Sequence, residues 1–171
     1  LPRNLRFIGH GGDAAKRVHA EGIHLYAVNS SASSINGVMI DSNYFGPYTS
    51  GIHTTAHIYL DGNIIGSPLI TNNEFVQLGG AYSPSNGSIY NKNAATTLIF
   101  NNTFSSDGSG LAVQATSKGV TAKNNIVSKF REWFSVSPAT CDYNIVFQTP
   151  ASSAVEGSHS LTKDPLLSST L

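Results

Sequence analysis

The chain contains very little cysteine and few charged side chains. Cys141 is the single cysteine among 171 residues, so no disulfide can form within the chain and a zinc site built from cysteines is excluded. Charged residues make up 12% of the chain, compared with roughly 25% in typical soluble proteins. Ten basic and ten acidic residues balance to zero net charge and form no basic run, so we expect no nucleic-acid partner.

Long apolar runs are also lacking, and so is any convincing amphipathic helix. The apolar runs are too short for a membrane span, and we expect none. Asn, Ser, Thr and Gly are abundant, whereas Leu, Lys and Glu are scarce. Such a composition is typical of a disordered chain or of a repetitive β architecture with Asn and Gly in its turns. Periodicity distinguishes the two.

One short pattern recurs five times: an apolar residue, two further residues, an asparagine, one residue and a second apolar residue. A weaker sixth copy begins at Leu5 and places His10 in the asparagine position. Repeats of roughly 20 to 50 residues are typical of solenoids, in which each unit buries its apolar face against its neighbours. The five asparagines, with spacings of 30, 29, 23 and 19 residues, are Asn43, Asn73, Asn102, Asn125 and Asn144.

The repeated asparagine has a physical role. Asn tolerates a left-handed backbone better than most residues, so we expect it at a sharp turn between two strands. Stacked Asn side chains can also hydrogen-bond along the axis as a ladder. Alternation predicts an inward column of core residues three positions before each asparagine, which makes Cys141 a buried, inert thiol. This column is Ile40, Ile70, Ile99, Ala122 and Cys141.

A second strand is expected after each asparagine, in a segment that often starts with glycine, as at Gly22, Gly51 and Gly110, with a looser copy at Gly87. A constant register is predicted because three apolar residues each lie nine positions past their asparagine: Ile52, Leu111 and Phe134. Loops are predicted at 11–21, 46–67, 76–96 and 147–160.

Two outward columns are expected beside the core column. Neither places two carboxylates on neighbouring coils, and Lys123 beside Asp142 indicates an ion pair between coils. An apolar stripe on this face either lies under a loop or contacts another chain; it consists of Met39, Leu69, Leu98 and Phe100. The full columns are Met39, Leu69, Leu98, Thr121 and Thr140, and Asp41, Thr71, Phe100, Lys123 and Asp142.

The Asn-Asn-x-Phe repeat resembles the right-handed parallel β-helix repeat of pectate-lyase-like proteins. Residues 158–167, Ser-His-Ser-Leu-Thr-Lys-Asp-Pro-Leu-Leu, are similar to a segment often found after the last coil of such proteins. The resemblance covers roughly residues 4 to 167 and predicts an all-β fold, a right-handed parallel β-helix of about six coils. We expect residues 1–171 to form a single domain. No cap is visible before Leu5, so we expect the C-terminal part of a longer β-helix or a chain that stacks on a partner.

The resemblance implies an extracellular or cell-surface module that binds or processes polysaccharide. As an enzyme it would be a polysaccharide lyase or a glycoside hydrolase, and whether it is an enzyme stays open. Lyases of this superfamily need a base together with a divalent cation such as calcium, or an arginine, to neutralise the substrate carboxylate. Polygalacturonase-like hydrolases need clustered aspartates, and their local motifs are absent here, so no catalytic residue is carried over.

Histidine supplies the main candidates for a site. Two Gly-Ile-His copies predict that His24 and His53 lie at matching positions on successive strands, close enough for the imidazoles to touch. A stacked pair of surface histidines is the simpler interpretation, and two ligands do not make a metal site, so no metal ligands are predicted. The catalytic candidates are His24, His53 and Arg17, and the candidates for substrate binding are Tyr26, His57 and Tyr59.

A structural or assembly module, such as a fibre, spike or adhesin segment, is the alternative function. The uncapped start, the apolar stripe, the low charge and the missing catalytic cluster favour it, and its partner would be a second copy or a neighbouring β-helix segment. An acid cluster or a bound cation beside the His24 strand would favour polysaccharide chemistry instead.

Overall fold

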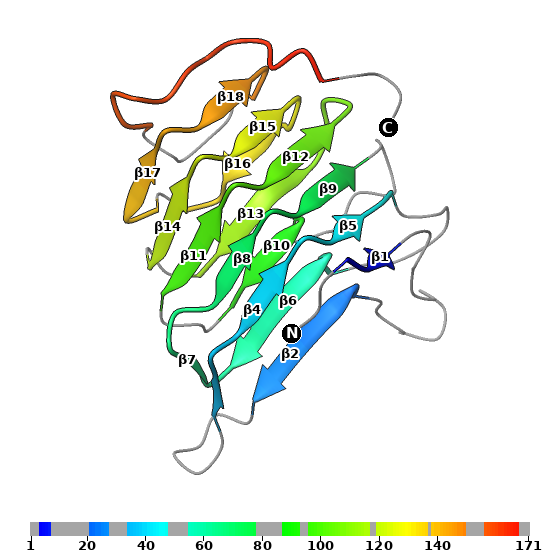
Figure 1. Ribbon diagram of the computed structural model, residues 1–171, viewed down its shortest axis with the longest axis vertical. Helices are drawn as coiled ribbons and strands as arrows, with labels where there is room; N and C mark the ends of the chain where they lie inside the picture. The colour runs from blue at the N-terminus through cyan, green and yellow to red at the C-terminus, as the bar shows by residue number, and fades with distance from the viewer. Residues whose placement is uncertain are drawn as a thin grey trace.

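The structure is a computed structural model that describes residues 4–7, 21–27, 34–47, 55–77, 87–92, 96–116, 119–136, 138–149 and 156–167. The regular elements in these ranges are all β-strands, and the paired strands run parallel (Figure 1). No helix with the length and apolar character needed to cross a membrane occurs in these ranges. The chain is therefore all-β, as the repeat predicts.

Three parallel sheets carry most of the strands. Sheet I contains β4 (Met39–Asp41), β8 (Leu69–Thr71), β11 (Thr97–Phe100), β14 (Val120–Lys123) and β17 (Thr140–Asp142). Sheet II contains β1 (Arg6–Phe7), β5 (Tyr44–Phe45), β9 (Glu74–Gln77), β12 (Thr103–Ser106), β15 (Ile126–Ser128) and β18 (Ile145–Phe147). Sheet III contains β2 (Ile23–Ala27), β6 (Ile58–Gly62), β10 (Ile89–Asn91), β13 (Leu111–Ala115) and β16 (Glu132–Phe134). A fourth, two-stranded sheet joins β3 (Ile35–Asn36) to β7 (Ile64–Ile65).

From β2 onward the chain visits the large sheets in the order III, I, II, and each return adds one strand beside the previous one. Figure 1 shows the resulting stack, which runs from β2 at one end to β17 and β18 at the other. Parallel neighbours need a long crossover connection, and here the strands of the other two sheets provide it.

The predicted core column is confirmed. Its five residues are at most 5% exposed, and each lies opposite the next across sheet I. A second buried column consists of Phe45, Phe75 and Phe104 on sheet II, whose rings stack with centroids 4.8 and 4.7 Å apart. Apolar burial of this kind is the main favourable contribution to folding, and here it is continuous along the stack.

The asparagine ladder is also confirmed. After Asn43, the side-chain oxygen of each ladder asparagine accepts hydrogen bonds from the backbone N–H and the side-chain amide of the previous ladder asparagine. From Asn125 to Asn144, for example, these distances are 2.9 and 3.0 Å. The amides also donate to carbonyls around the turn, as Asn73 does to Thr71 and Ile40 at 2.8 and 2.9 Å.

The left-handed backbone at these turns belongs to the residue before each ladder asparagine, which corrects the sequence prediction. The φ angles at these positions lie between 55° and 59°. A serine and a tyrosine are tolerated there, so the requirement for asparagine comes from the hydrogen bonds of the ladder. The left-handed residues are Ser42, Asn72, Asn101, Asn124 and Tyr143.

The first copy of the repeat has a different register from the one predicted. Arg6 lies opposite Tyr44, and the N–H of Leu5 donates to the side-chain oxygen of Asn43 at 3.1 Å. Leu5, not His10, therefore occupies the ladder position. Because leucine has no side-chain amide, the side-chain ladder ends at Asn43.

The predicted register of sheet III is wrong. Phe134 lies opposite Val113 and not Leu111, and Ile58 rather than Ile52 takes the matching position on β6. Counting from the asparagine fails because the connection between sheets II and III varies in length. The ranges 46–67 and 76–96, predicted as loops, accordingly contain β6, β7 and β10, whereas Ile52 lies outside the described residues.

Residues 156–161 cover the last coil. The N–H of Leu161 donates to Asn144 O at 2.7 Å, and the N–H of Val146 donates to Leu161 O at 2.8 Å. Ser160 Oγ and Glu156 Oε2 accept the ladder donors of Asn144, at 3.1 and 3.2 Å. This segment therefore occupies the position that a further coil would take against sheets I and II.

Candidate functional site

Three aromatic rings stack across neighbouring strands on the outer side of sheet III. His24 on β2 lies opposite Tyr59 on β6, which lies opposite Tyr90 on β10. The ring centroids are 4.5 and 4.9 Å apart, with interplanar angles of 9° and 12°. We call these three residues the ring ladder. They face outward because Ile58, Leu60 and Ile89, at the alternate positions of these strands, are fully buried.

A polar pair borders the ring ladder. Asp61 Oδ2 accepts a hydrogen bond from Tyr59 Oη at 3.1 Å and forms an ion pair with Lys92 Nζ at 3.2 Å. Lys92 Nζ also lies 5.9 Å from the centroid of the Tyr59 ring, within the range of a cation–π contact. The ring ladder with Tyr26, Asp61 and Lys92 is called the ring face below.

These contacts shift the pKa values of the three groups in ways that keep the pair charged. Burial tends to raise the pKa of Asp61, but hydrogen bonds from Lys92 and Tyr59 outweigh it and hold that pKa below its ordinary value. The pKa of Lys92 is raised by its contacts with Tyr59 and Asp61. Burial, followed by the effect of Asp61, raises the pKa of Tyr59.

Three of the predicted site residues come together on this face. Tyr26 is 61% exposed and meets His24 edge to face, with ring centroids 6.1 Å apart at 64°. Tyr59 is half-buried between His24 and Tyr90. The functional roles assigned to these three residues stay predictions.

The predicted stacking of His24 on His53 is wrong, because Tyr59 takes the position opposite His24. His53 and Arg17 lie outside the described residues. His57 is fully buried: its ring packs 5.8 and 5.9 Å from Phe45 and Phe75. His57 therefore has no exposed surface, and its predicted role in substrate binding stays a prediction.

Sheet I offers no comparable site. Lys123 lies opposite Asp142, but the Asp142 carboxylate binds His159, with Oδ2 2.8 Å from His159 Nδ1. The predicted Lys123–Asp142 ion pair is therefore wrong. The apolar stripe of the outer columns is half-buried rather than open.

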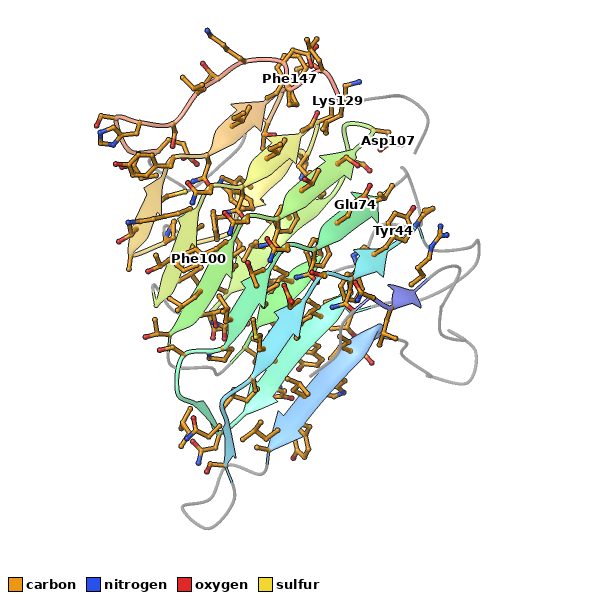
Figure 2. All side chains as sticks on the ribbon, in the orientation of Figure 1. Tyr44, Glu74, Phe100, Asp107, Lys129 and Phe147 are labelled. Atoms are coloured by element: carbon orange, nitrogen blue, oxygen red, sulfur yellow. The ribbon has the colours of Figure 1, made fainter. Side chains whose placement is uncertain are left out.

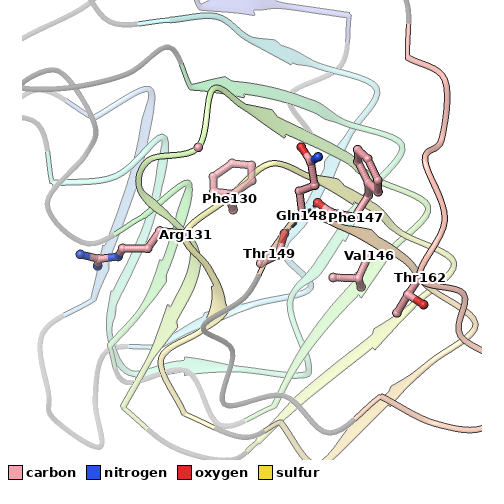
Figure 3. A pocket seen from close by; sticks show the side chains of 8 residues that line it. Phe130, Arg131, Val146, Phe147, Gln148, Thr149 and Thr162 are labelled. Carbon is pink, nitrogen blue, oxygen red and sulfur yellow. Dashed lines mark hydrogen bonds between the residues drawn. The ribbon is translucent and has the colours of Figure 1, made fainter.

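A hollow of about 720 Å³ lies beside the end of β18 (Figure 3). Phe130, Val146 and Phe147 supply its apolar lining. Arg131 is its one charged residue, and in Figure 3 the Arg131 side chain extends away from the other labelled residues. Among the described residues that line the hollow there is no histidine, cysteine or carboxylate.

The ring face can bind polar ligands, but its two outward columns carry a single carboxylate, Asp61. Glycoside hydrolysis usually needs two. Within the described ranges, no three His, Cys, Asp or Glu side chains come together as a metal site would require. No family of proteins, curated protein or solved structure matches the chain.

Sequence reasoning missed Asp61, Tyr90 and Lys92. A signal for them is present, because an isoleucine followed by an aromatic residue recurs at Ile23-His24, Ile58-Tyr59 and Ile89-Tyr90. Aligning these pairs, in place of the two Gly-Ile-His copies, predicts the observed register.

Proposed function

We propose that the chain is a right-handed parallel β-helix of about six coils, secreted or displayed on the cell surface, that binds polysaccharide. The observation that carries the proposal is the ring face, which combines exposed aromatic surface with a charged pair on one outer sheet. Sugar-binding surfaces need this combination, because a sugar has both apolar C–H faces and many hydroxyl groups. The successive parallel sheets and the ladder support the β-helix.

The geometry indicates how a sugar chain would be held. Both faces of the Tyr59 ring are covered, by His24 and Tyr90, so only its edge and hydroxyl can contact a ligand. Tyr26 is the most exposed ring and supplies the open aromatic surface. Lys92 and Asp61 then provide a donor and an acceptor for hydroxyl groups beside that ring.

The ring face repeats at the strand spacing of about 4.8 Å, because each coil contributes one residue to each column. A linear polymer that runs along the stack would meet Tyr26, Asp61 and Lys92 on successive coils. The proposal is limited to binding, since a single carboxylate paired with Lys92 does not provide an acid and a base.

Substitution of Tyr26 tests the proposal. We expect Tyr26→Ala to weaken binding to polygalacturonate or to a neutral xylan about tenfold, which corresponds to a loss of roughly 1.4 kcal/mol in binding free energy. Lys92→Gln should weaken binding as well. Affinity gel electrophoresis measures both, and release of reducing ends from the same polymers detects any cleavage.

Tyr143→Ala is the matched control, because Tyr143 is also an exposed tyrosine, 50% exposed, but lies in the turn between β17 and β18 and not on sheet III. Equal binding by wild type, Tyr26→Ala and Lys92→Gln would refute the proposal. So would the absence of binding to both polymers.

An assembly module is the weaker alternative. Residues 156–161 already pair with the last coil, which removes this edge as a site for strand addition. Light scattering over a range of protein concentrations distinguishes the two functions, since growth of the measured mass with concentration would favour assembly.

A further inference from the structure

The outer side of sheet III carries little charge from β2 to β13. The column of the ring ladder continues at Gln114 on β13, which lies opposite the last ring of the ladder. The neighbouring outward column consists of Tyr26, Asp61, Lys92 and Thr116. The described residues of these two columns therefore provide one carboxylate and one ammonium group.

Other carboxylates lie outside these columns. Figure 2 labels Glu74 on β9, a strand of sheet II, and Asp107 in the segment that follows β12. Glu132 lies on β16, beyond the four strands that form the columns. Among the described residues of the two columns, the charge is therefore set by a single pair, Asp61 and Lys92.

The ammonium group of Lys92 is accessible but already has a carboxylate beside it. The Lys92 side chain is 42% exposed, whereas the Asp61 side chain is 12% exposed. Because Lys92 Nζ lies 3.2 Å from Asp61 Oδ2, a ligand carboxylate in contact with Nζ at about 3 Å would come within about 6 Å of that oxygen. This separation is shorter than the screening length of about 8 Å at physiological ionic strength, so the two carboxylates would repel each other.

A sugar hydroxyl group meets no such repulsion. It is uncharged, and it can accept a hydrogen bond from Lys92 while the ion pair with Asp61 stays intact. A ligand carboxylate could take Lys92 over completely only by leaving the largely buried Asp61 carboxylate without its ammonium partner, which is costly. Further along the columns, the amide of Gln114 and the hydroxyl of Thr116 are also neutral donors and acceptors.

We infer that the ring face selects neutral polysaccharides over anionic ones, an inference that rests on the proposed function. Tyr26 offers apolar contact area to both classes of polymer, so the difference arises at the Asp61–Lys92 pair. A neutral polymer forms no ion pair with the face, and salt therefore has little to screen.

Two matched pairs of polymers test the selection. The first pair is polygalacturonate and its fully methyl-esterified form, and the second is glucuronate-branched xylan and unbranched xylan. Within each pair the two polymers share a backbone and differ in charge. Titration calorimetry of the whole chain at about pH 7.5, where histidine side chains are mostly neutral, measures the affinities. In each pair that binds, we expect the neutral polymer to bind about tenfold more tightly, with an affinity that added salt leaves unchanged.

Failure of the selection is distinguishable from failure of the proposed function. An anionic polymer that binds more tightly than its neutral partner, or within about threefold of it, would refute the selection and leave polysaccharide binding standing. If none of the four polymers binds, polysaccharide binding is itself refuted, and the selection with it.

Variants of the charged pair test the cause of the selection. Asp61→Asn keeps an acceptor for the Tyr59 hydroxyl but removes the negative charge. The anionic polymers should then gain about tenfold relative to the neutral ones, and high salt should abolish that gain. Asp164→Asn removes the same charge from the exposed C-terminal segment and should leave the preference unchanged. The wild-type preference in Asp61→Asn would overturn the role of the pair.

If Asp61→Asn does not fold, Lys92→Gln decides, because the Lys92 side chain is largely at the surface. This variant leaves Asp61 negative with no ammonium beside it, so the preference for neutral polymers should widen. A preference equal to that of wild type, or smaller, would contradict the inference.

Discussion

Asn73 accepts two hydrogen bonds from Asn43 at its side-chain oxygen, one from the backbone N–H and one from the side-chain amide, each 3.0 Å long. The two residues are 30 positions apart. Because the same contact recurs at each coil, loss of one interior asparagine would leave buried donors and acceptors on both neighbouring coils. The ladder therefore couples coils that differ in the length of their connections.

Removal of an interior member of the ladder should be strongly destabilising. Asn102→Ala removes the acceptor of Asn73 and the donor to Asn125. It also removes the amide that donates to the backbone carbonyls of Ile70 and Phe100. We expect a loss of about 3 kcal/mol in the free energy of unfolding, measured by urea denaturation. Asn101→Gly is the matched control: Asn101 is exposed with φ of 56°, which glycine adopts readily, so a small change is expected. Equal losses in the two variants would contradict a structural role of the ladder.

Glu156 should stabilise the end of the stack at the last coil. Its Oε1 accepts from Trp133 Nε1 and Cys141 Sγ, at 2.9 and 3.0 Å, and its Oε2 accepts from Ser160 Oγ at 2.7 Å. Burial, with a further contribution from Glu156, raises the pKa of the Cys141 thiol above its ordinary value. We expect Glu156→Ala to cost about 2 kcal/mol of stability.

The same substitution should make Cys141 react faster with a thiol reagent near neutral pH, because the thiolate loses a neighbouring negative charge and gains access to water. Glu132→Ala, which removes a half-buried carboxylate of β16, is the control and should leave the rate unchanged. An unreactive thiol in Glu156→Ala would show that groups other than Glu156 protect Cys141 from the reagent.

Acid should loosen the C-terminal segment. The hydrogen bond from His159 is the main cause that lowers the pKa of Asp142 below its ordinary value of 3.8. A carboxyl whose folded-state pKa is lowered stabilises the fold above its unfolded pKa, and this contribution disappears as the pH falls through the folded value. Wild type should therefore lose stability below about pH 4. Asp142→Asn and His159→Gln should both flatten this dependence, measured by thermal unfolding in a series of buffers, and a slope as steep as that of wild type in both would rule out the pair.

Burial of the inward column should make it more sensitive than the outward one. Ile70 is fully buried, while Leu69, the preceding residue, is half-buried on the outer side. We expect Ile70→Ala to lower the free energy of unfolding by about 2 to 4 kcal/mol, and Leu69→Ala to lower it by clearly less. Chemical denaturation followed by tryptophan fluorescence gives both values, since Trp133 is buried in the core of the same stack. The reverse order would mean that the alternation of sheet I is misassigned.

The sequence alone was enough to predict the all-β class, the ladder asparagines and the core column from Ile40 to Cys141. These features repeat because every coil must satisfy the same hydrogen bonds and fill the same interior, so they leave a pattern that can be read along the chain. Alternation also predicted that the neighbours of each core residue face outward, but two of these neighbours, Asp41 and Thr71, are buried.

The tertiary structure alone decided which residues meet on sheet III. The connection between sheets II and III has no fixed length, so neither the distance from Asn43 nor the resemblance of two Gly-Ile-His copies determined the partner of His24. Burial of Ile58 and Leu60 in the common core positions β6, and the side-chain alternation of that strand then brings Tyr59, and not His53, against His24. Hydrogen bonds and packing between coils, which no local pattern encodes, also bring Glu156 to Trp133 and Arg6 close to Glu74.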